Sequence, residues 1–311
     1  MNEKNETMVT FFILNGLSDI PQLQVPIFFL VLLIYLISLG GNMSILLLVC
    51  LDSQLHTPMY FFLCNLSIVN MTSTTVTLYR ILGIFVTGNN VVSFNDCMAQ
   101  VYFFGWLCGN ELILLTIMSY DRYVAICKPL HYSAVMNSKV YVGLAIFCWS
   151  FSLLQILPAM GILSRLSCYT SIKINHFFCD IIGLMYLSCD DTSILELLIF
   201  TQGGLLSVFT PFLLTFISYS FIIATIMRIR SSTGRAKAFY TCSSHLTVVT
   251  LHYASLVCQY FTPIGTIKSS KFLSLLNTAV IPMLNPFIYS LKNKDVKSAL
   301  QRKLKYFMIN F

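Results

Sequence analysis

The sequence predicts an all-α integral membrane protein that folds as a seven-transmembrane helix bundle. Of its 311 residues, 57% are hydrophobic and 10% are charged, whereas about 25% of the residues of a typical soluble domain are charged. Apolar stretches long enough to cross a bilayer, which takes roughly 20 residues per helix, recur along the whole chain. They are residues 26–50, 58–83, 97–120, 140–162, 196–224, 241–262 and 272–291.

The distribution of basic residues predicts the orientation of the chain. An odd number of spans places the termini on opposite sides of the membrane, and Lys and Arg collect on the cytoplasmic side. With the N-terminus outside, 13 of the 19 basic residues fall in cytoplasmic segments. The net charge of +7 therefore reflects this asymmetry and contact with membrane lipid. No nucleic-acid partner is expected.

This topology divides the chain into three parts. Residues 1–25 form an extracellular tail with a glycosylation sequon at Asn5, and residues 26–291 form the seven-transmembrane domain. The tail carries acidic residues early, so no cleaved signal peptide is expected. Residues 292–311 form a cytoplasmic tail. Its apolar residues recur at helical spacing among basic ones, which predicts a short amphipathic helix on the inner membrane surface; they are Val296, Leu300 and Leu304.

Four of the eleven cysteines fall on the extracellular, oxidising side: Cys97, Cys168, Cys179 and Cys189. An even number of cysteines in that compartment predicts disulfides. Spacing alone allows three pairings.

Six short motifs lie in or beside the predicted spans. They are Gly41-Asn42, LHTPMYFFLCNLS at 55–67, MSYDRYVAICKPLHY at 118–132, SY at 218–219, KAFYTCSSHL at 237–246 and PMLNPFIYSLKN at 282–293. In this order they closely resemble the odorant receptors, a large family of rhodopsin-like G-protein-coupled receptors, in its tetrapod-type (class II) branch. The resemblance covers almost the whole chain.

The resemblance implies a function at the plasma membrane, in olfactory cilia. Such a receptor binds a small volatile ligand outside and activates a stimulatory, olfactory-type G protein inside, which raises cyclic AMP. It needs no cofactor and is not an enzyme, and no nucleophile–base set is evident here. A receptor of the same build that senses a metabolite in another tissue is the alternative. A transporter or channel would need paired repeats or a polar pore, which the sequence lacks.

The resemblance also implies a switch at the cytoplasmic ends of the spans. Asp121 holds Arg122 in the idle receptor, and Arg122 then swings toward the G protein. Pro286 breaks a backbone hydrogen bond and so predicts a hinge in span seven. His245 is expected to flank the surface where a G protein docks. The residues assigned to the switch are Asp121, Arg122, Tyr123, Tyr219, His245, Asn285, Pro286 and Tyr289.

Three buried polar positions are expected inside the bundle: Asn42, Asn70 and Glu111. The family pairs a glutamate such as Glu111 with an aspartate in span two, but Asn70 stands at that position here. A two-carboxylate cation site is therefore lost, and Asn70 leaves open a receptor that does not signal. Glu111 is expected to hydrogen-bond to Asn70 and Asn285, and the sequence offers it no evident partner charge.

On the outside, the resemblance implies the disulfides Cys97–Cys179 and Cys168–Cys189. His176 and Cys179 lie in a motif for which copper binding has been proposed in the family. Because a disulfide consumes Cys179, no metal site is expected.

The expected ligand pocket lies in the outer halves of spans three, five, six and seven. It is mostly apolar with a few hydroxyls, which suits a small uncharged hydrophobic molecule and disfavours a cationic amine. His252 stands beside it where relatives carry an aromatic residue, and adds a titratable group. The expected lining is Phe104, Gly105, Cys108, Gly109, Leu112, Gly203, Ser207, Tyr253, Leu256, Val257, Tyr260, Leu275 and Thr278.

Overall fold

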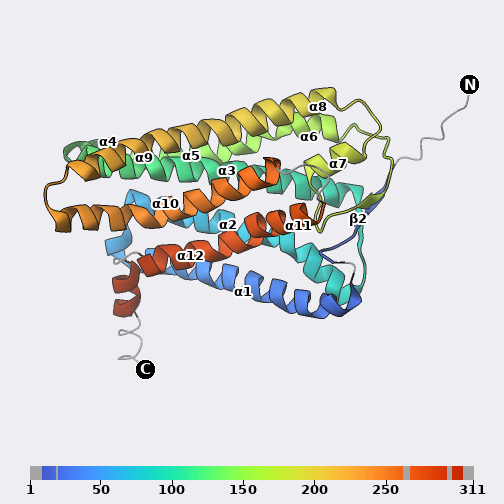
Figure 1. The fold of residues 1–311 in the computed structure, drawn as a ribbon, viewed down its shortest axis with the longest axis horizontal. Coiled ribbons are helices and arrows are strands. Elements are labelled where there is room, and N and C mark those ends of the chain that lie inside the picture. Colours follow the sequence, from blue (N-terminus) through green and yellow to red (C-terminus); the bar gives the residue numbers. More distant parts are fainter. Residues whose placement is uncertain (1–8, 19, 262–266, 293–295, 304–311) are drawn as a thin grey trace, which may run out of the picture.

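Seven helical spans lie side by side along one axis in the computed structural model, which describes residues 9–18, 20–261, 267–292 and 296–303 (Figure 1). The spans are α1 (Pro21–Leu51), α2 (Pro58–Thr87), α3 (Phe94–Cys127), α5 with α6 (Ser138–Gln155, Leu157–Leu163), α8 with α9 (Ser193–Leu198, Thr210–Arg228), α10 (Ser232–Phe261) and α11 with α12 (Ile267–Leu275, Ile281–Lys292). Six of them are long and apolar enough to cross a bilayer, and α10 is the seventh.

Within the described residues, six of the seven spans begin earlier than the sequence predicted, among them the first and the sixth. The first helix begins at Pro21 rather than at residue 26, because a proline fits the first turn of a helix, where no amide hydrogen is needed. Pro26 then lies inside the helix. The sixth span begins at Ser232 rather than at residue 241, since a helix continues past the apolar core of the membrane when its polar turns remain solvated.

Helix α3 is the central element of the bundle. It packs against α2, α5, α9 and α10. Leu114, Leu115 and Met118 are completely inaccessible, and Leu112 is 1% exposed. This buried helix therefore carries residues of all three assigned groups: ligand binding, the buried polar site and the switch.

Two spans contain a π-helical segment, Ile199–Phe209 before α9 and Leu276–Val280 before α12. A π-helical turn shifts the register of the side chains that follow it and is frequent at functional sites. Ser207 and Thr278, both assigned to the pocket, lie in these two segments.

The extracellular segments form a small three-stranded sheet. Strand β1 (Phe11–Leu14) lies between β2 (Val91–Ser93) and β3 (Lys173–Ile174), antiparallel to the former and parallel to the latter. Phe12 is fully buried, and its ring meets Tyr169 at 5.1 Å between centroids. The end of the N-terminal tail is thus a strand fixed to the bundle.

Two disulfides hold the long outer connection in place, Cys97–Cys179 and Cys168–Cys189. The connection also contains the short helix α7 (Ile181–Leu187). Gln100 accepts the amide hydrogen of Cys179 at 2.8 Å and donates to Val76 O at 2.7 Å. This amide therefore ties the connection to α2 and α3 beside the first disulfide.

The cytoplasmic end carries short 3₁₀ turns at Ser53–Leu55 and Pro129–His131, helix α4 (Tyr132–Val135) and a helical tail at residues 296–303. Val296 and Ala299 are buried against the bundle, whereas Leu300 is 46% exposed. Arg302 donates to Asp52 Oδ2 at 2.7 Å and holds the tail to the first inner turn. This arrangement agrees with the predicted amphipathic helix; Leu304 lies outside the described residues.

Candidate functional site

The outer part of the bundle brings together several residues assigned to the pocket. The Phe104 ring meets Phe178 of the outer connection edge-on at 5.0 Å, and both pack in one apolar cluster with Leu275. Deeper in the bundle, Leu112 of α3 joins Tyr253 and Leu256 of α10 in the main core. The assigned side chains thus form an upper group beneath the outer connection and a lower group near the bundle centre.

Gly105 and Gly109 do not face the expected pocket. A β-carbon built on Gly105 would lie 2.8 Å from Ile156 Cδ1, and one on Gly109 would lie 3.5 Å from Ser152 Cβ. These two glycines allow α3 to approach the fourth span closely. The prediction placed them on the pocket face because i, i+4 spacing identifies a common face but not the neighbour that the face meets.

The two aliphatic hydroxyls assigned to the pocket already have partners within the protein, whereas the buried Tyr253 hydroxyl has no hydrogen-bond partner among the described residues. Ser207 donates to Gln202 O at 2.8 Å and accepts from Gln155 Nε2 at 2.5 Å, while Thr278 donates to Ser274 O at 2.8 Å. Their oxygens can still accept a hydrogen bond from a ligand, but their protons are already donated to carbonyl groups of the protein.

Three other assigned residues have different surroundings. A β-carbon on Gly203 would meet nothing within 4 Å. Val257 is 53% exposed, whereas its neighbour Leu256 is buried. The side chain of Tyr260, and the sequon residue Asn5, lie outside the part of the chain that the structure describes.

Glu111 faces a histidine rather than the two asparagines expected from the sequence. His252 Nδ1 lies 3.5 Å from Glu111 Oε1, and the two side chains are 3% and 6% exposed. The predicted hydrogen bonds are wrong: the Asn285 amide has no hydrogen-bond partner, and Asn70 donates to Asn42. The register of α10 turns His252 inward, so this helix supplies the partner that α2 was expected to supply.

Asn42 joins three spans through its side chain. Its amide donates to Ser38 O at 2.8 Å and to Pro282 O of span seven at 3.1 Å, and its oxygen accepts from Asn70 at 3.2 Å. A β-carbon at the adjacent Gly41 would lie 3.1 Å from the ring of Pro286. The Gly41-Asn42 motif therefore brings α1 into contact with the hinge region of α12.

At the inner end of α3, Asp121 is bonded to a tyrosine and not to Arg122. Tyr132 donates to Asp121 Oδ1 at 2.8 Å, and within the described part of the chain no ion pair joins Asp121 to Arg122. The expected closed latch is therefore absent from this structure. The hydrogen bond from Tyr132 engages the carboxylate that the latch would use.

Arg122 is partly buried, and its Nε atom has no hydrogen-bond partner within the described part of the chain. Tyr219 and Tyr289, which are also assigned to the switch, are buried. Tyr219 and His245 share a hydrogen bond of 2.6 Å with their rings nearly parallel, and His245 is completely inaccessible. The expectation that His245 flanks the docking surface is thus wrong, because its face of α10 packs against α9.

The outer connection places His176 beside the seventh span. Its Nε2 atom lies 3.2 Å from Ser274 Oγ, and burial, together with the Lys271 ammonium, lowers the pKa of His176 to about 3. Burial also raises the pKa of Asp180 to about 6. Lys271 donates to Gly16 O at 2.8 Å and so fixes the tail over the same region.

Sequence reasoning missed the partners of these groups. Tyr132 lies in the motif at 118–132 but had no role assigned to it, and no motif marked Gln100 or the pairing of His252 with Glu111. A signal existed only for His252, which stands where relatives carry an aromatic residue.

Comparison with known proteins identifies the family of this chain. Residues 31–306 match the family model described as "Olfactory receptor". The chain is 46% identical to human "Olfactory receptor 6C3" over 299 residues, 96% of each chain, and 45% identical to mouse "Olfactory receptor 5AR1" over 304 residues, 97% of this chain and 98% of that one. Squid rhodopsin matches with a TM-score of 0.70 at 19% identity, over 94% of this chain and 88% of that one.

These matches cover nearly the whole chain and agree with a seven-helix bundle. The protein is accordingly a multi-pass membrane receptor and not an enzyme. The chain belongs to the olfactory receptor family of rhodopsin-like G-protein-coupled receptors.

Proposed function

We propose that this receptor binds small, mostly hydrophobic volatile molecules between the outer halves of its spans and activates a stimulatory, olfactory-type G protein, which raises cyclic AMP. The plasma membrane of olfactory cilia is the proposed location. The observation that carries the G-protein half of the proposal is the set of buried side chains assigned to the switch: Arg122 is partly buried, and Tyr219, Tyr289 and His245 are buried, with Tyr219 hydrogen-bonded to His245.

The ligand half of the proposal rests on the chemistry of the outer region. Phe104, Leu275 and Phe178 are apolar and pack in one cluster, and Leu112, Tyr253 and Leu256 belong to a second apolar cluster. Such surroundings bind a ligand mainly by dispersion and apolar burial, with about 25 cal/mol gained per Å² removed from water. The committed hydroxyl protons of Ser207 and Thr278 favour a ligand that donates a hydrogen bond over one that only accepts.

The exposure of the Leu130 side chain supports a docking surface for a partner protein at the inner end of the bundle. It lies in the turn after α3 and is 93% exposed, the largest exposed fraction among the large hydrophobic side chains of the described residues. An isolated apolar side chain exposed beside a functional switch is a suitable anchor for a partner protein, since buried anchors of this kind dominate binding energies at interfaces.

The test is a cyclic AMP assay in cells that express the chain with an olfactory-type stimulatory G protein, screened against a panel of volatile alcohols, aldehydes, esters and hydrocarbons. A dose-dependent rise that Arg122→Ala abolishes, at unchanged surface expression, is the expected result. Arg165→Ala, which alters an exposed extracellular arginine, is the matched control and leaves the response intact. A response that survives Arg122→Ala, or no response to any volatile despite normal surface expression, contradicts the proposal.

A further inference from the structure

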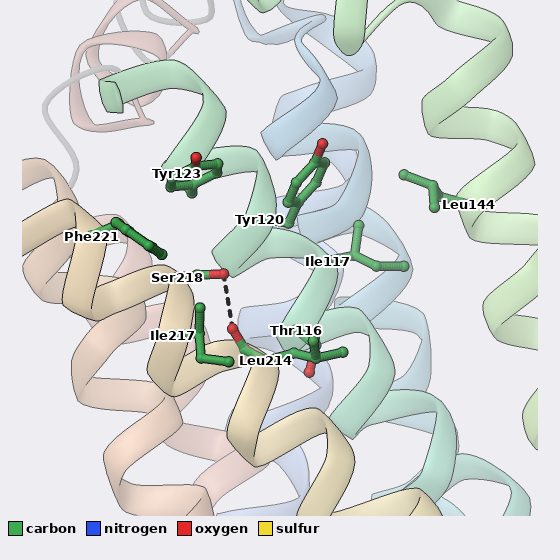
Figure 2. Close-up of a pocket in the computed structure, with 9 residues that line it drawn as sticks. All are labelled: Thr116, Ile117, Tyr120, Tyr123, Leu144, Leu214, Ile217, Ser218 and Phe221. Carbon is green, nitrogen blue, oxygen red and sulfur yellow. Dashed lines mark hydrogen bonds between the residues drawn. The ribbon is translucent and has the colours of Figure 1, made fainter. Parts of the chain in front are cut away.

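A groove of about 420 Å³ lies on the surface of the bundle between α3, α5 and α9 (Figure 2). It is separate from the outer pocket, and among the residues assigned to the switch only Tyr123 lines it. Its walls include Thr116, Tyr120 and Tyr123 from α3, Leu144 from α5, and Ser218 and Phe221 from α9. Tyr120 and Phe221 are 43% and 55% exposed. Because these helices are membrane spans, the groove opens toward lipid.

The groove presents a hydrocarbon surface. The two aliphatic hydroxyls in its walls are already used, since Ser218 donates to Leu214 O at 2.9 Å (Figure 2) and Thr116 donates to Leu112 O at 2.9 Å. The rings of Tyr123 and Phe221 lie 5.9 Å apart and form part of the floor. An apolar chain suits this surface better than a molecule that needs hydrogen bonds along its length.

Polar contacts link α3 and α9 near both ends of the groove. Toward the outside, Thr116 Oγ1 lies 3.2 Å from Thr215 Oγ1; toward the cytoplasm, Cys127 Sγ lies 3.2 Å from Thr225 Oγ1. The two helices are therefore linked above and below the groove. The groove therefore lies between helices whose relative position these contacts fix.

Two basic residues lie at its cytoplasmic end. Lys128 Nζ lies 5.8 Å from the centre of the Tyr123 ring, and the ring lines the groove. Arg228 follows Phe221 by two helical turns on the same face of α9, and both basic side chains are exposed. The inner leaflet carries anionic lipids, and each basic residue near that surface adds about 1 kcal/mol of attraction.

We propose that the groove binds an anionic phospholipid of the inner leaflet, with one acyl chain between Tyr120, Leu144 and Phe221 and the phosphate headgroup at Lys128 and Arg228. The charge at the mouth favours this occupant over a sterol, whose neutral hydroxyl gains little from two cations. Tyr123 directly follows Arg122, so the bound lipid packs against the helical turn that carries the switch arginine.

The experiment uses the purified full chain in nanodiscs made of equal parts phosphatidylcholine and phosphatidylserine, followed by native mass spectrometry of the lipids that remain bound in detergent. The receptor is expected to retain phosphatidylserine preferentially. Ser218→Trp fills the groove and abolishes this retention. Phe216→Trp, at a 60% exposed position on the same helix outside the groove, retains the lipid.

The charges are tested by the double variant Lys128→Gln and Arg228→Gln, which alters no buried side chain. Each lost charge lowers phosphatidylserine retention about fivefold, the equivalent of about 1 kcal/mol. Lys139→Gln with Arg235→Gln removes two other exposed cytoplasmic charges and leaves retention unchanged. Equal losses in both double variants, or equal retention by Ser218→Trp and Phe216→Trp, overturn the proposal. Retention of cholesterol instead, from discs that contain both lipids, also overturns it.

Discussion

His252 Nδ1 lies 3.5 Å from Glu111 Oε1 and joins the central helix α3 to α10 in the interior of the bundle. Both side chains are buried, and a buried charge is costly unless a partner compensates for it. As a pair, an acid and an imidazole that hold one proton between them carry no net charge, whichever group holds the proton. Glu111 therefore has a partner in His252, although Asn70 stands where a second carboxyl group was expected.

This contact predicts coupled effects of mutation. In a double-mutant cycle of Glu111→Gln and His252→Phe, each single variant is expected to lower the unfolding temperature. The double variant loses less than the sum, with a coupling free energy of about 0.5–3 kcal/mol because the two groups are in direct contact. Thermal unfolding of the purified receptor measures this. His245→Phe, another buried histidine of α10, is additive with Glu111→Gln; equal coupling in both cycles would disprove a specific pair.

Tyr132 is expected to control how strongly the receptor signals without ligand. Tyr132→Phe removes the hydrogen bond to Asp121 and frees that carboxylate to pair with Arg122, which favours the idle state. Hydrogen bonds to charged groups contribute about 1.5–3 kcal/mol, so basal cyclic AMP should fall about tenfold or more. Tyr141→Phe, whose ring packs on Phe61, leaves it unchanged. An unaltered basal level in Tyr132→Phe at equal surface expression would show that this bond does not hold the switch.

The two adjacent glycines of α1 should respond oppositely to alanine. Gly41→Ala forces a β-carbon to within 3.1 Å of Pro286 and is expected to destabilise the bundle by about 1–3 kcal/mol. Gly40→Ala meets nothing within 4 Å and should be neutral or stabilising, since alanine favours a helix by up to about 1 kcal/mol over glycine. Thermal unfolding distinguishes them, and equal effects would rule out a tight contact between α1 and the hinge.

His176 predicts an acid-sensitive outer surface. Burial lowers its pKa from 6.5 to about 3, so below pH 6.5 the unfolded chain binds a proton that the folded chain does not. The free energy of unfolding therefore decreases as the pH falls from 6.5 toward 3. His176→Gln should flatten this part of the pH profile relative to the parent chain. His131→Gln, an exposed histidine of the inner turn, should preserve the slope.

Asp52 predicts a second acid-sensitive contact, at the cytoplasmic tail. The hydrogen bond from Arg302 holds the pKa of Asp52 below 3.8, so the contact stabilises the docked tail above that pH and is lost as the pH falls through the lowered value. Arg302→Gln should weaken tail docking at neutral pH and remove the additional loss in acid. Hydrogen exchange of the amides of residues 296–303 measures docking; acid-induced exchange that is unchanged in Arg302→Gln would contradict this assignment.

Features that depend on one segment of the chain at a time could be predicted from the sequence. Apolar stretches of bilayer length predicted the seven spans, and the excess of cytoplasmic Lys and Arg predicted their orientation, because lipid and its surface charge act on each segment separately. The family motifs identified Arg122 and Pro286, and the resemblance implied the two disulfide pairings. Gly105 and Gly109 were assigned to the wrong surroundings, because helical spacing shows which residues share a face but not which neighbour that face meets. The resemblance likewise did not show that His245 is buried.

The sequence alone thus determined the span pattern, the topology and the family. Only the tertiary structure decided the partners, which are His252 for Glu111, Tyr132 for Asp121 and Asn42 for Asn70. It also decided that the tail forms a strand whose Phe12 side chain is buried. The reason is physical. Insertion into a membrane depends on the composition of each span by itself, whereas a contact between spans depends on the rotation and depth of two helices that adjust to all their neighbours together.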